Sequence, residues 1–142
     1  MEELKALAAR LLETGEGAEA FERCVGSCDH GELLHTLALE YTPHSEVSMP
    51  IYRRLEQLRP HDPQIAAEFG FVHWLCGDDS QAREQASRAE SLDGDNIDGI
   101  LLRAALATGV AEKEALYRRV LDIDADHAVA KENLNRLASP TN

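Results

Sequence analysis

The chain has 142 residues, of which 26 are acidic and 14 basic, so its formal net charge at pH 7 is -12. A protein that binds duplex nucleic acid needs a surface rich in lysine and arginine, and this charge excludes that class and disfavours binding to anionic lipid. With 44% hydrophobic residues the chain can bury a core, and its length fits a single domain, residues 1–142.

Helix-forming residues dominate the chain, and the alternating β-branched runs that are typical of strands are missing. Segments of about 9 to 14 residues, the usual helix length, alternate with short turn-like stretches. In chain order these stretches are residues 14–17, 28–29, 42–43, 59–63, 77–79, 93–96 and 122–126. The sequence therefore predicts an all-α fold of about nine helices.

Several of the predicted helix starts carry a capping signal. Asp62 precedes Pro63, which places an N-cap acceptor before a residue that fits the first helical turn. Asp29 and Asp78 each precede a Glu or Gln by three residues, which is the spacing of a capping box with aspartate in place of serine or threonine. We expect helices to begin directly after these three aspartates.

Nothing in the sequence indicates export or membrane insertion. The first five residues lack the basic stretch and the apolar run of a secretory signal, and no window approaches the roughly 18 to 20 consecutive apolar residues of a membrane span. The three cysteines, Cys24, Cys28 and Cys76, cannot all pair within the chain, which disfavours a disulfide framework. We expect a cytoplasmic protein.

The turn-like stretches divide the chain into similar units with small residues at matching places. Small residues allow two antiparallel helices to approach closely, and a helix pair cannot bury its apolar face alone, so such pairs stack. In residues 63–96 the first predicted helix carries Ala66, Phe69, Gly70 and His73, the second carries Ala82, Ala86 and Ala89, and Gly94 lies in the closing turn.

This pattern resembles the tetratricopeptide repeat. The resemblance extends over residues 1–138, as four degenerate repeats at about 1–30, 31–62, 63–96 and 97–127 and a capping helix at 128–138. It implies a right-handed α-α superhelix, a solenoid of stacked helix pairs.

Two features depart from the repeat pattern. Residues 42–49 predict a long loop within the second repeat, whose second helix then spans only about residues 50–58. Arg103 stands where leucine is usual in the fourth repeat.

One group of residues has a spacing that metal sites use. Cys24, Cys28 and His30 would supply three ligands, but no fourth is evident, and packing of Cys24 within its repeat is the simpler interpretation. His73 stands at a packing position of the repeat, and the sequence has no nucleophile motif and no glycine-rich phosphate loop. We expect no catalytic residue, no metal and no cofactor.

The aspartates of residues 122–126 resemble the start of an EF-hand loop. His127 and Asn133 stand where that loop needs a glycine and a bidentate glutamate. We therefore expect an inter-repeat turn with an N-capping aspartate.

Proteins of the tetratricopeptide family curve so that the first helix of each pair lines a concave groove, which usually binds an extended peptide or a partner's helix. The resemblance places these residues at the groove: Lys5, Ala9, Leu12, His35, Leu39, Gln64, Ala67, Phe71, Trp74, Asp98, Leu101, Ala105 and Thr108. The basic clamp with which the best-known members hold a terminal carboxylate is missing, because only Lys5 remains at its positions. Phe71 and Trp74 either line the groove or are buried against the neighbouring pair, and the sequence leaves both interpretations open.

We expect a non-enzymatic protein–protein interaction module. Apolar groove residues would give affinity, and the surrounding acids would favour an amphipathic or basic-flanked segment of another protein. Two alternatives remain: a small cytoplasmic chaperone similar to those of type III secretion, which shields a client protein, and a structural component that self-assembles as a homo-oligomer. Neither a nucleic acid nor a membrane is expected as a partner.

Overall fold

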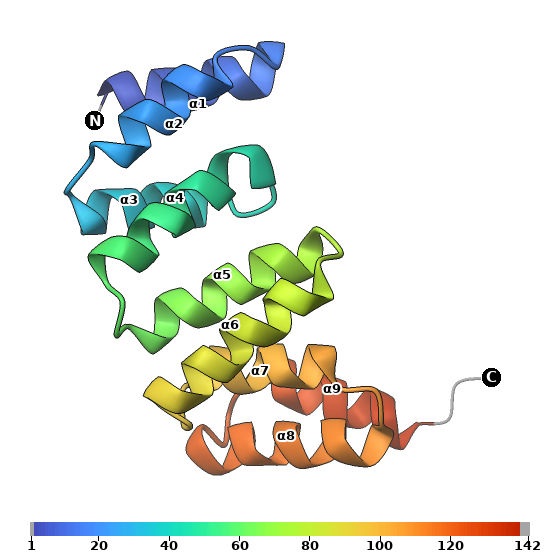
Figure 1. Ribbon diagram of the computed structural model, residues 1–142. Helices are drawn as coiled ribbons and strands as arrows, with labels where there is room; N and C mark the ends of the chain where they lie inside the picture. The colour runs from blue at the N-terminus through green and yellow to red at the C-terminus, as the bar shows by residue number, and fades with distance from the viewer. Residues whose placement is uncertain (1, 140–142) are drawn as a thin grey trace.

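Nine α-helices and no strands occupy residues 2–139, the part of the chain that the computed structural model describes (Figure 1). In chain order they are α1 (Glu2–Thr14), α2 (Ala18–Gly26), α3 (Gly31–Glu40), α4 (Ser45–Leu58), α5 (Pro63–Leu75), α6 (Asp79–Leu92), α7 (Ile97–Leu106), α8 (Val110–Ile123) and α9 (Ala128–Ala138). The predicted all-α class is confirmed for this range. Of the helices described, none is long and apolar enough to cross a membrane.

Consecutive helices pack in pairs: α1 on α2, α3 on α4, α5 on α6, and α7 on α8, with α9 against α8. In Figure 1 these pairs follow one another along the molecule, with α1 and α2 at one end and α8 and α9 at the other. α5 connects the two halves, because it contacts α4 and α7 as well as α6. Each range predicted as a repeat thus contains two consecutive helices.

The starts of α5 and α6 confirm two of the capping signals in the sequence. Oδ1 of Asp62 accepts hydrogen bonds from the backbone amides of Gln64 and Ile65, at 2.9 and 3.4 Å, and Pro63 begins the helix. Oδ1 of Asp78 accepts from the amide of Gln81 at 3.2 Å. These bonds satisfy amides that have no partner within the helix, which fixes where each helix begins.

The end of α5 is set by a glycine in the left-handed conformation. Gly77 has φ of 78°, which a residue with a side chain rarely adopts. Its amide donates to the carbonyl of Trp74 at 3.0 Å, and the amide of Asp78 donates to the carbonyl of His73 at 2.9 Å. This pairing is a Schellman motif, and it ends the helix at Leu75, with Cys76 as the C-cap residue.

The predicted cap of α3 is wrong. His30 is the N-cap residue and makes no side-chain capping bond, whereas Oδ1 of Asp29 accepts a hydrogen bond from Nη2 of Arg54 at 2.6 Å. A guanidinium supplied by α4 competes with the helix amides for this carboxylate, and a capping rule based on local spacing does not include that partner.

The start of α9 also differs from the expected aspartate cap. Nδ1 of His127 accepts a hydrogen bond from the amide of Ala130 at 3.3 Å, so histidine is the capping residue. Asp124 accepts from the amide of Asp126 at 3.2 Å and stabilises the preceding turn. Residues 122–126 therefore include a turn between α8 and α9, as expected, but the cap comes from the next residue.

α4 begins at Ser45, so the long loop predicted for residues 42–49 is wrong. Pro50 lies inside the helix, where it supplies no N–H and normally ends a helix. Val47 and Ile51, one helical turn apart, are completely buried. Burial of this apolar face stabilises the additional helix against the cost of the proline, and that burial depends on the neighbouring helices.

Small residues let α5 lie close to α6 and α7. Gly70 is buried, and a Cβ added there would overlap Cδ2 of Leu102 and lie 3.2 Å from Cβ of Gln85. Ala82 and Ala89 of α6 are completely buried. Larger apolar side chains fill the remaining space, in one cluster that extends from α1 to α5 and a second around α7, α8 and α9.

An arginine closes each of the three junctions that precede α3, α5 and α7. The turn offers a backbone carbonyl, and the second helix of the following pair supplies the guanidinium. The hydrogen bonds are Arg54 Nε to the carbonyl of Cys28 at 2.9 Å, Arg88 Nη2 to Pro60 at 2.7 Å and Arg119 Nη2 to Gly94 at 2.8 Å. We call Arg54, Arg88 and Arg119 the inter-pair arginines; each also forms an ion pair, with Asp29, Glu56 and Asp95 respectively.

Candidate partner-binding surface

Four helices surround an open hollow of about 330 Å³. Its lining comes from α5, α7, α8 and α9: Phe71, Trp74, Leu101, Ala105, Lys113, Tyr117, Val129 and Asn133. The structure thus brings together four of the residues predicted for the groove. The contributions of α8 and α9 were missed, because the prediction considered only the first helix of each of the four repeats. Val129 and Asn133 lie one helical turn apart in the amphipathic segment 128–138, and this spacing could have identified the contribution of α9.

The two aromatic residues of the hollow are packed differently. Phe71 is half-buried and packs against the apolar cluster between α6 and α7. Trp74 has 39% of its surface exposed and meets the Phe71 ring edge-to-face, with centroids 6.3 Å apart and planes at 85°. Phe71 therefore anchors the surface to the core, while Trp74 offers an open aromatic face.

A polar network lies beside the hollow, toward the starts of α5 and α7. Nε2 of Gln64 donates to Oδ2 of Asp98 at 2.5 Å, and Oε1 of Gln64 accepts from the Asn96 side chain at 2.9 Å. Nε2 of His35 lies 2.8 Å from both carboxylate oxygens of Glu68, which joins α3 to α5. His35, Gln64 and Asp98 were predicted, whereas Glu68 was missed although it lies one helical turn after Gln64.

Glu68 is the titratable group of this network whose protonation the fold changes most clearly. Burial raises the pKa of its carboxyl group, against the lowering effect of the hydrogen bond and charge of His35. The nearby carboxylates of Asp98 and Asp62 raise the pKa further. The network therefore holds negative charge close together in a partly desolvated place.

The remaining predicted groove residues are more scattered. Ala67 is completely buried in a cluster with Ala66 and Ala89, so it contributes packing and no contact surface. Lys5 and Leu39 are exposed on α1 and α3, and Leu39 has 54% of its surface exposed. On α1, Ala9 and Leu12 are half-buried. Thr108 lies at a different hollow, described next.

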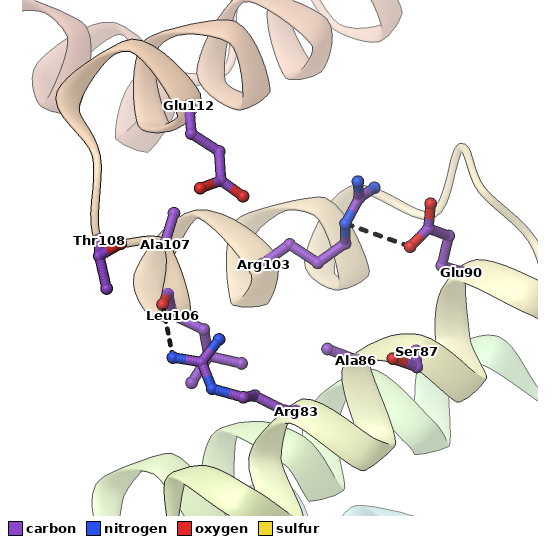
Figure 2. A pocket seen from close by; sticks show the side chains of 9 residues that line it. All are labelled: Arg83, Ala86, Ser87, Glu90, Arg103, Leu106, Ala107, Thr108 and Glu112. Atoms are coloured by element: carbon purple, nitrogen blue, oxygen red, sulfur yellow. Dashed lines mark hydrogen bonds and ion pairs between the residues drawn. The ribbon is translucent and has the colours of Figure 1, made fainter.

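A second hollow, of about 280 Å³, lies between α6, α7 and the start of α8 (Figure 2). Nη2 of Arg83 donates to the carbonyl of Leu106 at 3.0 Å, and Nε of Arg103 lies 3.4 Å from Glu90. Arg103, which stands where the resemblance predicts a leucine, thus forms an ion pair between α6 and α7. Nη1 of Arg103 is buried and has no hydrogen-bond partner among the described residues. Glu112 is the fourth charged residue in the lining, which thus has two positive and two negative side chains.

The cysteines are unpaired, and Cys24 and Cys28 are half-buried near the end of α2. Burial raises the pKa of the Cys24 thiol, and the neighbouring Glu3 and Cys28 add to this effect. A raised pKa lowers the thiolate fraction that ligation and nucleophilic attack require. Within residues 2–139, no three or more His, Cys, Asp or Glu side chains are grouped so as to hold a metal ion.

Comparison of the chain with models of known protein families and with curated proteins finds no match.

Proposed function

We propose that the chain is a tetratricopeptide-repeat protein, with four degenerate repeats and α9 as a capping helix, that acts as a non-enzymatic, cytoplasmic protein-interaction module. Paired helices with buried Gly70, Ala82 and Ala89 at their seams support the repeat assignment. The right-handed superhelix is part of this proposal. Small-angle scattering would test the elongated dimensions of the molecule in solution, and a crystal structure would test the hand of the superhelix.

The observation that carries the proposed function is the hollow formed by α5, α7, α8 and α9. Trp74 and Val129 keep 39% and 48% of their surfaces exposed beside the half-buried Leu101. Exposed apolar residues that converge on one concavity are a common feature of sites that bind an apolar side chain of a partner. Each side chain buried there would contribute roughly 1.5 to 3 kcal/mol.

The natural fluorescence of the protein provides the assay, because Trp74 is its one tryptophan and lines the hollow. A displayed library of amphipathic segments of about 15 to 20 residues would be selected for binding. Selected segments should shift the emission of Trp74 to shorter wavelength as they exclude water from its ring.

Two valines provide a matched pair of variants. Val129→Asp places a charge in the hollow, whereas Val110→Asp makes the same change at a residue that is 58% exposed and outside the lining. Val129→Asp should weaken binding at least tenfold and Val110→Asp should leave it unchanged, since charge burial in an apolar contact is costly. If no segment is selected, or if both variants bind equally well, the proposed function is wrong.

A further inference from the structure

On the surface that α5 and α7 share, acidic side chains lie toward the starts of the helices and apolar side chains lie further along. The acidic groups Glu68 and Asp98 precede the apolar residues Phe71, Leu101 and Ala105 on the same two helices. Residues three, four or seven positions apart lie on the same side of a helix, so acid and hollow face one partner. At a rise of 1.5 Å per residue, Asp98 lies about 10 Å before Ala105 along α7.

Neither carboxylate is paired with a lysine or arginine within residues 2–139. Glu68 is paired with His35, whose ring is charged only when it is protonated. Asp98 accepts its hydrogen bond from the neutral side-chain amide of Gln64. The one lysine in the lining of the hollow, Lys113, donates through Nζ to the backbone carbonyl of Ala104 at 3.1 Å, and the inter-pair arginines pair with other carboxylates.

A cation at this place would relieve an existing electrostatic penalty. The Glu68 side chain is only 11% exposed, and its pKa is raised chiefly by burial. The carboxylates of Asp98 and Asp62 raise the pKa of Glu68 further, which means that their negative charge disfavours its ionised form. A positive group brought by a partner would favour the ionised form of Glu68 and would be attracted by all three.

We propose that the partner is an amphipathic segment with an apolar side chain that enters the hollow and an arginine or lysine, one or two helical turns away, that pairs with Glu68 and Asp98. This inference rests on the proposed function, because it specifies the partner of the same surface. The guanidinium displaces the imidazole of His35 from Glu68 and reaches the carboxylate of Asp98; its planar set of donors suits two neighbouring carboxylates better than an ammonium does. The net charge of -12 also attracts basic segments over distance.

The test uses a helical host peptide of about 18 residues with apolar anchors along one face. A single arginine is moved along that face, and glutamine at the same position is the reference. Affinities are measured by the emission of Trp74. Arginine one or two turns from the main anchor should bind roughly tenfold more tightly than glutamine, and arginine on the opposite face should give no gain.

Variants of the protein then locate the effect. Glu68→Gln and Asp98→Asn should each reduce the gain from arginine at least threefold, whereas Asp122→Asn, an exposed aspartate on α8, should leave it intact. His35→Ala should strengthen binding of the arginine peptide more than binding of the glutamine peptide, because it removes the group that arginine displaces.

The outcomes separate the two proposals. If the peptides bind and Val129→Asp abolishes binding, but arginine gives no gain or Glu68→Gln leaves the gain intact, the proposed function stands and this inference is overturned. The inference is also overturned if His35→Ala affects both peptides equally. A shift of Trp74 emission that depends on protein concentration without peptide would assign the hollow to a second copy of this chain and would likewise overturn it.

Discussion

Replacing Gly70 with alanine tests whether the spacing of α5, α6 and α7 is set by close contact. The new Cβ would overlap Cδ2 of Leu102 and lie 3.2 Å from Cβ of Gln85. Leu102 is completely buried, so it has little space to rotate, and Cβ of Gln85 is fixed by its backbone. Overpacking of this kind costs about 1 to 3 kcal/mol, from which the better helix propensity of alanine recovers up to about 1 kcal/mol.

We therefore expect Gly70→Ala to lower the free energy of unfolding by about 1 to 2 kcal/mol. Urea unfolding followed by circular dichroism at 222 nm would show this as a midpoint lower by roughly 0.5 to 1 M. Gly26→Ala is the control: Gly26 is an exposed residue at the end of α2, and its added Cβ would meet no atom within 4 Å. That variant should be unchanged or up to about 1 kcal/mol more stable.

A second substitution identifies the responsible contact. Leu102→Val removes the atom that the new Cβ would overlap. In that background Gly70→Ala should become neutral or stabilising, because the extra methyl group then fills vacated space. If Gly70→Ala is as stable as Gly26→Ala, contact at Gly70 does not set the spacing of α5, α6 and α7. The same conclusion follows if Gly70→Ala has an equal effect with leucine and with valine at position 102.

Three further substitutions test other parts of the fold. His73 is buried, and this burial lowers the pKa of its imidazole below the ordinary value near 6.5. At a pH between these two pKa values, His73 is protonated in the unfolded chain and neutral in the folded chain. The free energy of unfolding should thus fall as the pH drops from 7 to 5, and the urea midpoint of His73→Phe should fall less than that of the wild-type protein. An equal fall in both proteins would contradict a role of His73 in this pH dependence. Asp62→Ala removes the cap of α5 and should cost about 1 kcal/mol, while Asp122→Ala, an exposed control, should stay within about 0.5 kcal/mol in the same assay. Pro50→Ala restores an amide to α4 and should raise stability by about 1 kcal/mol or more; a lower melting temperature would show that the proline suits its place.

The elements of the fold that local chemistry determines could be predicted from the sequence. Asp62 and Asp78 start their helices as expected, since each needs only amides two or three residues away. Asp29 and Pro50 misled the prediction because distant residues decide their roles: Arg54 takes the carboxylate of Asp29, and the buried face of α4 outweighs Pro50. Contacts with residues distant in the sequence cannot be predicted from local spacing.

The candidate site was predictable to a similar extent. Helix periodicity and the repeat resemblance predicted Phe71 and Trp74 on α5 and Leu101 on α7, and the structure places all three in the lining of one hollow. Ala67, although predicted in the same series, is completely buried, since the tight contact of α5 with α6 covers it. Glu68 was missed because its hydrogen-bond partner, His35, belongs to a different helix pair. Their contact depends on how α3 and α5 lie beside each other.

The inter-pair arginines give residues outside the hollow an influence on its shape. Arg119 joins α8 to the turn that leads into α7, and these two helices supply Tyr117 and Leu101 to the lining. Loss of this link would remove one contact between α8 and the turn before α7, while the buried apolar cluster that the two helices share would remain. Any change in how α7 and α8 lie would alter the width of the hollow without a substitution in its lining. Under the proposed function, a residue such as Arg119 would therefore affect which side chains the hollow admits without touching the partner.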